Sequence, residues 1–324
     1  MLSKWLSVSF FAPEKFTEET IESLKTELTD KAIIAASGGV DSTIAAVLAS
    51  RAVGDNLLAI YVDTGYMRLN ESEFVSSMLQ DLGVKHKVID ASKQFYEGLQ
   101  GVTDPEKKRK IIGELFIRVF EEEARKYGGK FLVQGTIAPD WIESGGGMRD
   151  TIKSHHNVGG LPEDMEMKLC EPIRELYKDE VRSLAEYLEV SVAHRQPFPG
   201  PGLAVRVMGE ATPKRAEIVR QACHIVENEL ESAASDGKME LPWQYFAVLL
   251  PVKTVGVQGD VRAYSNTIAV RAVQSYDAMT AQALDIPHSV LRKISERITR
   301  ELKSDVNRVV YDITDKPPGT IEWE

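Results

Sequence analysis

Up to about residue 190, short and uninterrupted apolar runs alternate with longer segments in which apolar residues recur at helical spacing. Such short, unbroken runs are typical of strands buried on both faces of a sheet. Four strands are predicted, at residues 32–36, 57–62, 84–89 and 131–133. Helices are predicted around them, at residues 17–29 with Thr17 as the cap, from 43 to about 54, 70–82, 105–127 and 178–188. This alternation indicates an α/β domain, a parallel doubly wound sheet with helices on both faces.

Beyond the stretch at 196–202, which holds three prolines and two glycines, the pattern changes. A strand is predicted through Val205 and Val207, followed by a long helix that opens at Thr212 and Pro213. Strands at 246–250, 268–273 and 308–313 and a helix at 287–302 complete the prediction. Because strands and helices no longer alternate, a smaller α+β domain is expected, and we place the domains at 1–202 and 203–324. A sheet this small needs a cover for one face, which a homodimer would provide.

A glycine turn with polar side chains lies between the first strand and the next helix: Ser37-Gly38-Gly39-Val40-Asp41-Ser42-Thr43. Two glycines let successive N–H groups point inward, and the start of a helix adds partial positive charge, so the turn suits a phosphate group. The Asp41 carboxylate would repel phosphates unless a cation lay between, and Mg2+ is the usual cation. The turn therefore predicts a site for a metal–nucleotide complex. The lysine-containing P-loop motif and the Gly-x-Gly-x-x-Gly motif are both absent from the sequence.

Two further polar loops follow predicted strands, at residues 63–65 and 134–136. Ligands of parallel sheets bind at the carboxyl ends of the strands, so we expect these loops and the glycine turn to line one crevice. Regular structure is predicted to stop at about residues 144–165, around the stretch Lys153-Ser154-His155-His156. A lysine and two histidines favour a lid over a linker. The alternatives are a solvated loop with incidental histidines and adventitious metal binding.

Composition narrows the choice of function. With 324 residues, the chain is longer than a single core usually accommodates. A formal net charge of −10 weighs against a nucleic-acid substrate, and the basic run at 107–110 is better explained as a solvated helix face than as a nucleic-acid patch. Two cysteines without a CxxC motif indicate neither disulfides nor a zinc site. Without a signal peptide or an apolar run long enough for a bilayer, a soluble, cytoplasmic protein is expected.

The glycine turn resembles the SGGVDS pyrophosphate loop of the N-type ATP pyrophosphatases, which cut ATP between its α and β phosphates. Further stretches are similar to the GMP synthetases: Gln134-Gly135-Thr136 with Asp140 and Ile142-Glu143-Ser144, residues 153–162, 197–202 and 316–324. The similarity extends from about residue 31 to residue 324, and the lid and C-terminal stretches are its most specific parts. Fewer than forty residues precede the turn, with no cysteine among them. The chain therefore resembles the separate ATP pyrophosphatase subunit of these enzymes, without a glutaminase domain.

The resemblance implies an adenine nucleotide alpha hydrolase-like fold followed by a C-terminal XMP-binding and dimerisation domain. It implies the amination of XMP to GMP with ATP and Mg2+. The C2 oxygen of XMP would attack the α phosphorus of ATP, and ammonia would displace the activated oxygen of the adenylyl-XMP intermediate, with release of AMP and pyrophosphate. Ammonia would come from a separate glutamine amidotransferase subunit. The implied assembly is a homodimer through the C-terminal domain, without a nucleic-acid or membrane partner.

The resemblance also implies roles for individual residues. The β and γ phosphates would be held by Ser37, Gly38, Gly39, Val40, Asp41, Ser42 and Thr43, with Asp41 directed to Mg2+. Adenine would lie at Val62 and the ribose at Gly135. Catalysis would involve Asp140, Glu143, Lys153, His155 and His156. XMP would be bound by Arg206 and Lys316 at its phosphate, by Ile321 and Glu322 at the purine edge, and by Gln258.

Two other interpretations are considered. An NAD synthetase or a tRNA-thiolating enzyme carries the same loop, although thiolation would need a reactive cysteine pair and an NAD synthetase would not be expected to end as residues 316–324 do. A nucleotide-binding sensor would keep the turn without turning a substrate over. The joint presence of Asp41, Asp140, Glu143 and Lys153 argues against a sensor.

Overall fold

The computed structural model describes residues 11–143, 167–192, 195–258, 260–276 and 278–324. The chain divides into two compact units. The first unit comprises residues 1–62, 72–89 and 118–195, and the second comprises 63–71, 90–117 and 196–324. The long helix α5 (Pro105–Tyr127) thus contributes its first half to the second unit and its second half to the first. The functional domains at 1–202 and 203–324 stay a prediction, because packing units and functional domains need not coincide.

The first unit is built on a five-stranded sheet in the order β3 (His86–Asp90), β2 (Leu57–Asp63), β1 (Ala32–Ala35), β4 (Phe131–Val133) and β5 (Lys168–Cys170). Strand β1 pairs in parallel with β2 and β4, and β4 pairs in parallel with β5. Ile33 and Ile34 in the central strand are buried, as expected for a strand covered on both faces. The predicted α/β fold class is confirmed.

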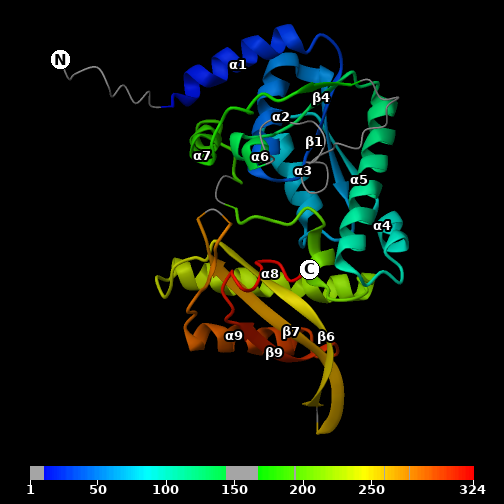
Figure 1. Cartoon of the computed structure of the whole chain (residues 1–324), viewed down its shortest axis with the longest axis vertical. Helices are drawn as coiled ribbons and strands as arrows, with labels where there is room; N and C mark the ends of the chain where they lie inside the picture. Colours follow the sequence, from blue (N-terminus) through cyan, green and yellow to red (C-terminus); the bar gives the residue numbers. More distant parts are fainter. Residues whose placement is uncertain (1–10, 144–166, 193–194, 259, 277) are drawn as a thin grey trace, which may run out of the picture. The chain divides into compact units, whose positions relative to one another are not determined.

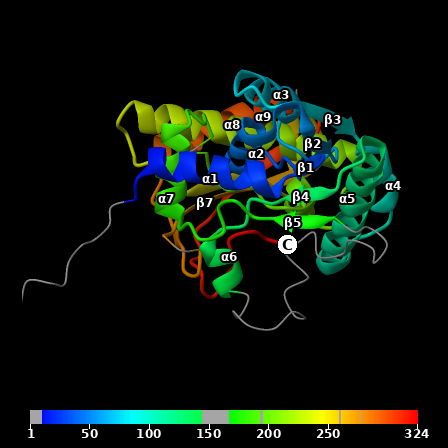
Figure 2. The same cartoon turned by 90° about the horizontal axis from the view of Figure 1, so that it is seen from above.

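Helices α1 (Pro13–Glu27), α2 (Val40–Val53) and α7 (Lys178–Tyr187) pack on one another on one side of this sheet, and the C-terminal half of α5 lies on the other (Figures 1 and 2). Helices α3 (Glu71–Asp81) and α6 (Ala138–Glu143) follow β2 and β4. The prediction that Thr17 caps the first helix is wrong. Proline at position 13 starts the helix one turn earlier, and the Thr17 hydroxyl lies inside it, donating to the Pro13 carbonyl at 2.7 Å.

The second unit contains an antiparallel pair of long strands, β6 (Gln244–Gln258) and β7 (Val261–Gln274), which Figure 1 shows side by side. Strand β9 (Val306–Asp312) pairs with β7 in parallel. The short β8 (Gln282–Ala283) pairs with the C-terminal end of β7. Helix α8 (Pro213–Ser235) packs against β6, and α9 (His288–Glu301) packs against α8 and β9. The short helix α4 (Ser92–Gly98) also belongs to this unit. The predicted α+β class is confirmed, with strands longer than expected.

The predicted strand through Val205 and Val207 is wrong. Residues Gly202–Arg206 form a 3-10 helix, η2, and Val207 makes only an isolated bridge to Leu249. Gly202 has φ +63, and a Cβ at this position would lie 2.4 Å from the Tyr66 carbonyl oxygen, so the chain turns sharply there. The apolar run after Gly202 is buried by tertiary packing rather than by a sheet, which periodicity alone cannot distinguish. Among the described residues, no helix is long and apolar enough to cross a membrane.

Candidate functional site

The glycine turn connects β1 to α2 as predicted, and its hydroxyl groups bond to one another. The Ser37 and Ser42 hydroxyls are 3.0 Å apart, and Ser42 and Thr43 both donate to the Gly39 carbonyl, at 3.2 and 2.7 Å. Gly38 has φ +78, a conformation that L side chains rarely adopt. Gly39 is the N-cap of α2, so the positive end of this 14-residue helix lies at the turn. The turn is therefore a preformed cradle whose polar groups suit an anion.

Two carboxylates act on each other at this turn. The pKa of Asp41, in the first turn of α2, is raised to about 6, first by burial and then by the negative charge of Asp140. Asp140 lies in α6, and its carboxylate accepts a hydrogen bond from the Ile137 amide at 3.0 Å. Two nearby carboxylates suit a hard divalent cation such as Mg2+, which would favour the charged form of Asp41. No group of three metal-binding side chains occurs among the described residues, so phosphate and water oxygens would complete the shell.

The loop after β4 approaches the glycine turn closely. A Cβ on Gly135 would lie 2.7 Å from the Asp41 carbonyl oxygen and 2.8 Å from the Ser42 nitrogen, so only glycine fits there. The neighbouring Thr136 hydroxyl is buried and has no hydrogen-bond partner among the described residues. An unpaired buried hydroxyl is costly unless a ligand or water satisfies it. Two of the three loops predicted to line one crevice, at 37–43 and 134–136, thus come together. The role of Gly135 beside a ribose stays a prediction.

A lysine that the sequence analysis did not select reaches this site. Lys178 is the first residue of α7, and its positive charge opposes the rise in the pKa of Asp41. The local sequence around Lys178 does not distinguish it from any other exposed lysine at the start of a helix. The cation predicted at this position, Lys153, lies outside the described residues with His155 and His156. Glu143 is the last residue of α6, and its side chain lies outside the described residues. Val62 is buried near the end of β2.

Two residues predicted to bind XMP lie together in the second unit. The Arg206 guanidinium donates to both oxygens of Glu322, at 2.8 and 3.1 Å, and its carbon lies 4.0 Å from the centroid of the Phe246 ring. Burial opposes the charge of Arg206, which is 1% exposed, yet the Glu322 carboxylate keeps its pKa above the ordinary value. The Gln244 side chain adds a third donor to Glu322 at 3.0 Å. Glu322 thus takes two of the five N–H donors of the Arg206 guanidinium.

The C-terminal segment, residues 316–324, is held to the rest of the second unit by hydrogen bonds. The main chains of Lys316 and Ala281 exchange hydrogen bonds at 2.7 and 3.0 Å, and the Lys316 ammonium donates to the Ala278 carbonyl at 2.8 Å. The buried Arg271 donates to the carbonyls of Thr314 and Thr320, and Ile321 is 9% exposed. The side chain of Gln258, at the end of β6, lies outside the described residues.

The prediction that the basic run 107–110 is a solvated helix face is wrong at one position. Lys108 is 0% exposed, and its ammonium pairs with the Glu324 carboxylate. Lys110 does lie in solvent, with 78% of its side chain exposed. The run therefore contains both a buried and a solvated lysine. The run of basic residues alone does not show which lysine is buried.

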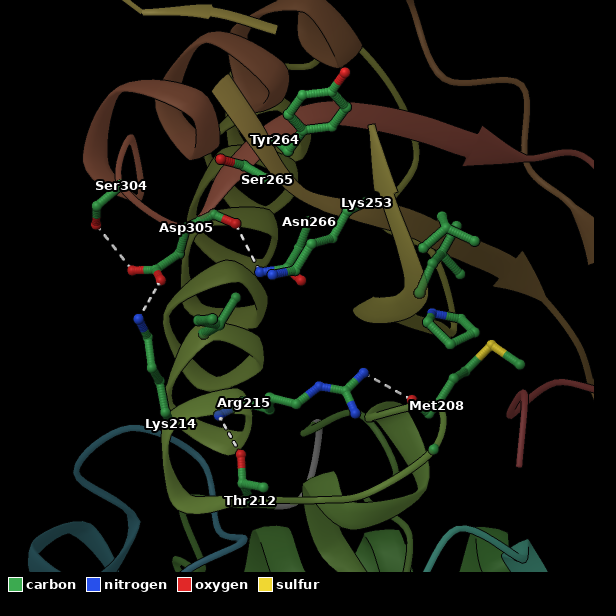
Figure 3. Close-up of a pocket in the computed structure, with 15 residues that line it drawn as sticks. Met208, Thr212, Lys214, Arg215, Lys253, Tyr264, Ser265, Asn266, Ser304 and Asp305 are labelled. Carbon is green, nitrogen blue, oxygen red and sulfur yellow. Dashed lines mark hydrogen bonds and ion pairs between the residues drawn. The ribbon is translucent and has the colours of Figure 1, made fainter. Parts of the chain in front are cut away.

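A pocket of about 510 Å³ lies in the second unit, where the start of α8 meets β6 and β7 (Figure 3). Two of its cations, Lys214 and Arg215, already bind groups within the protein. Lys214 pairs with Asp305 at 2.7 Å, and Arg215 donates to the carbonyls of Met208 and Glu210 at 2.8 and 2.7 Å. None of the residues predicted to bind ATP or XMP lines this pocket. We therefore do not assign it to the candidate active site.

Two family models match parts of the chain. The model described as NAD synthase matches residues 14–118, and the model described as GMP synthase C terminal domain matches residues 229–323. The first includes the glycine turn and the second includes most of the C-terminal segment. The first match agrees with the expectation that NAD synthetases carry the same glycine turn. The second match favours a GMP synthase over an NAD synthetase.

Curated relatives match over almost the whole length. The B subunit of the GMP synthase [glutamine-hydrolyzing] of Pyrococcus abyssi is 58% identical over 315 residues, which cover 96% of this chain and 99% of the relative. The corresponding protein of Thermoplasma acidophilum is 54% identical and is covered to 99%. The GMP synthase [glutamine-hydrolyzing] of Thermotoga petrophila is 55% identical, and the matched region covers 95% of this chain but 62% of that protein. The chain belongs to the family of GMP synthase (glutamine-hydrolysing) B subunits.

Proposed function

We propose that this chain aminates XMP to GMP, using ATP to activate the C2 oxygen as an adenylyl-XMP intermediate and releasing AMP and pyrophosphate. The observation that carries this proposal is the preformed cradle at residues 37–43, with Asp41 and Asp140 beside it, in a member of this family. A cradle for a polyanion suits a reaction in which pyrophosphate departs with high negative charge.

The turn would act by position and charge rather than by covalent chemistry. The hydrogen bonds among Ser37, Ser42 and Gly39 hold its shape before ATP arrives, so little reorganisation is needed. The Thr136 hydroxyl, buried beside the turn, would gain a partner from the bound nucleotide. The attacking group is the C2 oxygen of XMP, a poor leaving group that becomes a good one once adenylylated. Ammonia can then displace it.

Mg2+ would be held by Asp41, with Asp140 nearby, and would spread the negative charge of the phosphates. The donor set fits, because carboxylate oxygens are the ligands that Mg2+ prefers. Repulsion between the two carboxylates contributes to the raised pKa of Asp41, and a bound cation would relieve that repulsion. Lys178 supplies a further positive charge near the same carboxylate.

XMP would be read by the C-terminal segment. Ile321 is 9% exposed, and the part that is exposed would contact the purine. Glu322 accepts two hydrogen bonds at one oxygen and one at the other, so the second oxygen retains acceptor capacity. Within the described part of the chain, Lys316 has two ammonium donors beyond its bond to Ala278, enough to contact a phosphate. Because Arg206 binds Glu322 through two hydrogen bonds, Arg206 would orient this glutamate. Gln258, Lys153, His155, His156 and Glu143 remain part of the proposed site.

Ammonia would reach the chain from a separate glutaminase, because the relatives are named as one subunit of a glutamine-hydrolysing enzyme. A homodimer through the second unit is supported by apolar side chains along β6 and β7. Val255 faces Tyr264 across the two strands, and these side chains are 44% and 62% exposed. Val257 and Val261 at the hairpin end are 76% and 66% exposed. Sedimentation analysis should therefore give the mass of a dimer, and a monomer would contradict this assembly.

The decisive experiment measures AMP release by the purified chain with ATP, Mg2+, XMP and ammonium. Release that needs both XMP and ammonium supports the proposed reaction. Release that proceeds with deamido-NAD in place of XMP would make the chain an NAD synthetase instead. Nucleotide binding without turnover would make it a sensor. Adding a candidate glutaminase subunit should then replace ammonium with glutamine.

A further inference from the structure

Lys108, near the start of α5, is fully buried and all its donors are used. Its ammonium donates to the Val207 carbonyl at 2.7 Å, to the Ala204 carbonyl at 3.3 Å and to the Glu324 carboxylate. An ammonium has three N–H donors, so none remains for a substrate. Lys108 can therefore influence a reaction only through the groups that it holds.

The main group that it holds is Glu324, which is fixed on several sides. Its side chain is 5% exposed, and its second carboxylate oxygen accepts a hydrogen bond from the Gly209 amide at 2.9 Å. The Arg109 guanidinium donates to the main-chain oxygen of the same residue. Arg215 in turn holds the loop around Gly209 through the carbonyls of Met208 and Glu210, as Figure 3 shows for Met208. We call Lys108, Arg109 and Gly209 the Glu324 receptor.

One short segment of chain, residues 204–209, contributes both to the Glu324 receptor and to the binding of Glu322 by Arg206. Ala204 and Val207, whose carbonyls hold Lys108, flank Arg206, which binds Glu322 through two hydrogen bonds. Residues 322 and 324 are at most about 7 Å apart along an extended chain, so a displacement of one is transmitted to the other. The two acidic side chains are thus anchored side by side on residues 204–209.

Stability alone does not explain a lysine at this position. Burying an ammonium and a carboxylate costs desolvation, and apolar residues of similar volume in place of such a pair are often neutral or stabilising. The ion pair does, however, fix the place and direction of Glu324, which an apolar contact would leave free to slide. A buried pair that defines a position is expected where a neighbouring residue must meet a substrate.

We propose that Lys108 is a positioning residue for XMP, which holds Glu324 and thereby keeps Ile321 and Glu322 in the pose that reads the purine. This inference rests on the proposed function of the C-terminal segment. It makes one residue of the basic run of α5 part of substrate recognition, although Lys108 itself does not touch the substrate.

The test compares Lys108→Met and Glu324→Gln with the unaltered chain, and uses Lys110→Met as a matched control. Lys110 belongs to the same basic run, but its side chain is 78% exposed and its ion pair with Glu114 spans 4.0 Å. AMP release is measured with the full chain, Mg2+ and ammonium, while XMP and ATP are varied in turn. Both variants should raise the KM for XMP by about tenfold or more, because a charge-assisted contact is lost. The KM for ATP should stay within about twofold, as it should for both substrates in the control.

A double variant, Lys108→Met with Glu324→Gln, sharpens the test. If the lysine acts through the glutamate, the double variant should raise the KM for XMP no further than the more severe single variant. An unchanged KM for XMP in folded variants would overturn the inference, and so would an equal rise in the KM for both substrates. If Lys108→Met does not fold, Glu324→Gln decides, since it keeps the size of the side chain. If the unaltered chain releases no AMP in response to XMP, the proposed function fails first, and that outcome is seen before any variant is made.

Discussion

The glycine turn and the C-terminal segment are held by opposite kinds of interaction. At residues 37–43, uncharged hydroxyls bond to one another at the surface, and Ser37 and Gly39 remain exposed. The C-terminal segment is held by cations that are almost completely buried, namely Lys108, Arg206 and Arg271. Exposed neutral hydrogen bonds contribute little net stability, whereas a buried charge that loses its partner is strongly destabilising.

Because of this difference, we expect activity and stability to change independently at the glycine turn and together at the C-terminal segment. Changes to the glycine turn should alter the reaction and leave the fold almost as stable as before. Changes to the partners of the buried cations should weaken substrate binding and the fold together. The following predictions test that separation.

The largest effect is expected from Asp41→Asn. The amide cannot serve as an anionic ligand, so Mg2+-dependent AMP release should fall by about 100-fold or more. The thermal midpoint should not fall, because the charged Asp41 is disfavoured by burial and by Asp140 in the folded protein. Steady-state kinetics and a thermal melt measure the two quantities, with the exposed Asp81→Asn as control. Retained turnover would show that Asp41 is not a metal ligand. Unfolding of the variant would contradict the expectation that the glycine turn affects activity and not stability.

Glu322→Gln should affect binding and stability together. The buried Arg206 would lose its countercharge, so the free energy of unfolding should fall by about 2 to 4 kcal/mol. The KM for XMP should rise by about tenfold, since a purine N–H would meet a weaker acceptor. Urea denaturation and steady-state kinetics check the two effects, and the exposed Glu240→Gln is the matched control. An unchanged denaturation midpoint would show that the tail is no more coupled to the fold than the turn is.

Gly135→Ala tests a place where the glycine turn depends on close packing. Its Cβ would lie 2.7 Å from the backbone of Asp41, so α2 and the loop after β4 must separate slightly. Overpacking of this kind costs about 1 to 3 kcal/mol, and the KM for ATP should rise by several-fold as the cradle opens. Gly113→Ala is the control, because its Cβ would meet nothing within 4 Å. If Gly135→Ala leaves both quantities unchanged, the close approach has no functional meaning.

The same contrast explains which features the sequence could predict. The glycine turn is built from seven consecutive residues, and the two serine hydroxyls that meet in it are only five positions apart. Local pattern is sufficient for such a site. Lys108 and Glu324 are 216 positions apart and Arg206 and Glu322 are 116 apart, so no local pattern could pair them. The resemblance to a known family brought residues of the C-terminal segment into the predicted site, but it did not reveal what holds them.

Burial was misjudged for the same reason. A basic run on a helix predicts a solvated face, yet Lys108 is covered by residues 204–209 and by Glu324, which are distant in sequence. An apolar run after Gly202 predicts a strand, yet tertiary packing buries it as a 3-10 helix. In both cases the residue types were interpreted through neighbours in sequence, while the deciding neighbours came from elsewhere in the fold.

The smallest effect is expected from Lys178→Met, which removes an exposed cation that acts on Asp41 through space. Exposed charges are screened by water and salt, so the KM for ATP should rise only about two- to fivefold. The rise should be largest at low ionic strength and should shrink as salt is added, because only the screened attraction for the triphosphate is lost. Lys178→Arg should behave as the unaltered chain, and the exposed Lys130→Met is the control for a lost surface charge. A loss of thermal stability in Lys178→Met would place this lysine with the buried cations of the C-terminal segment, whereas a salt-dependent KM at constant stability would place it with the glycine turn.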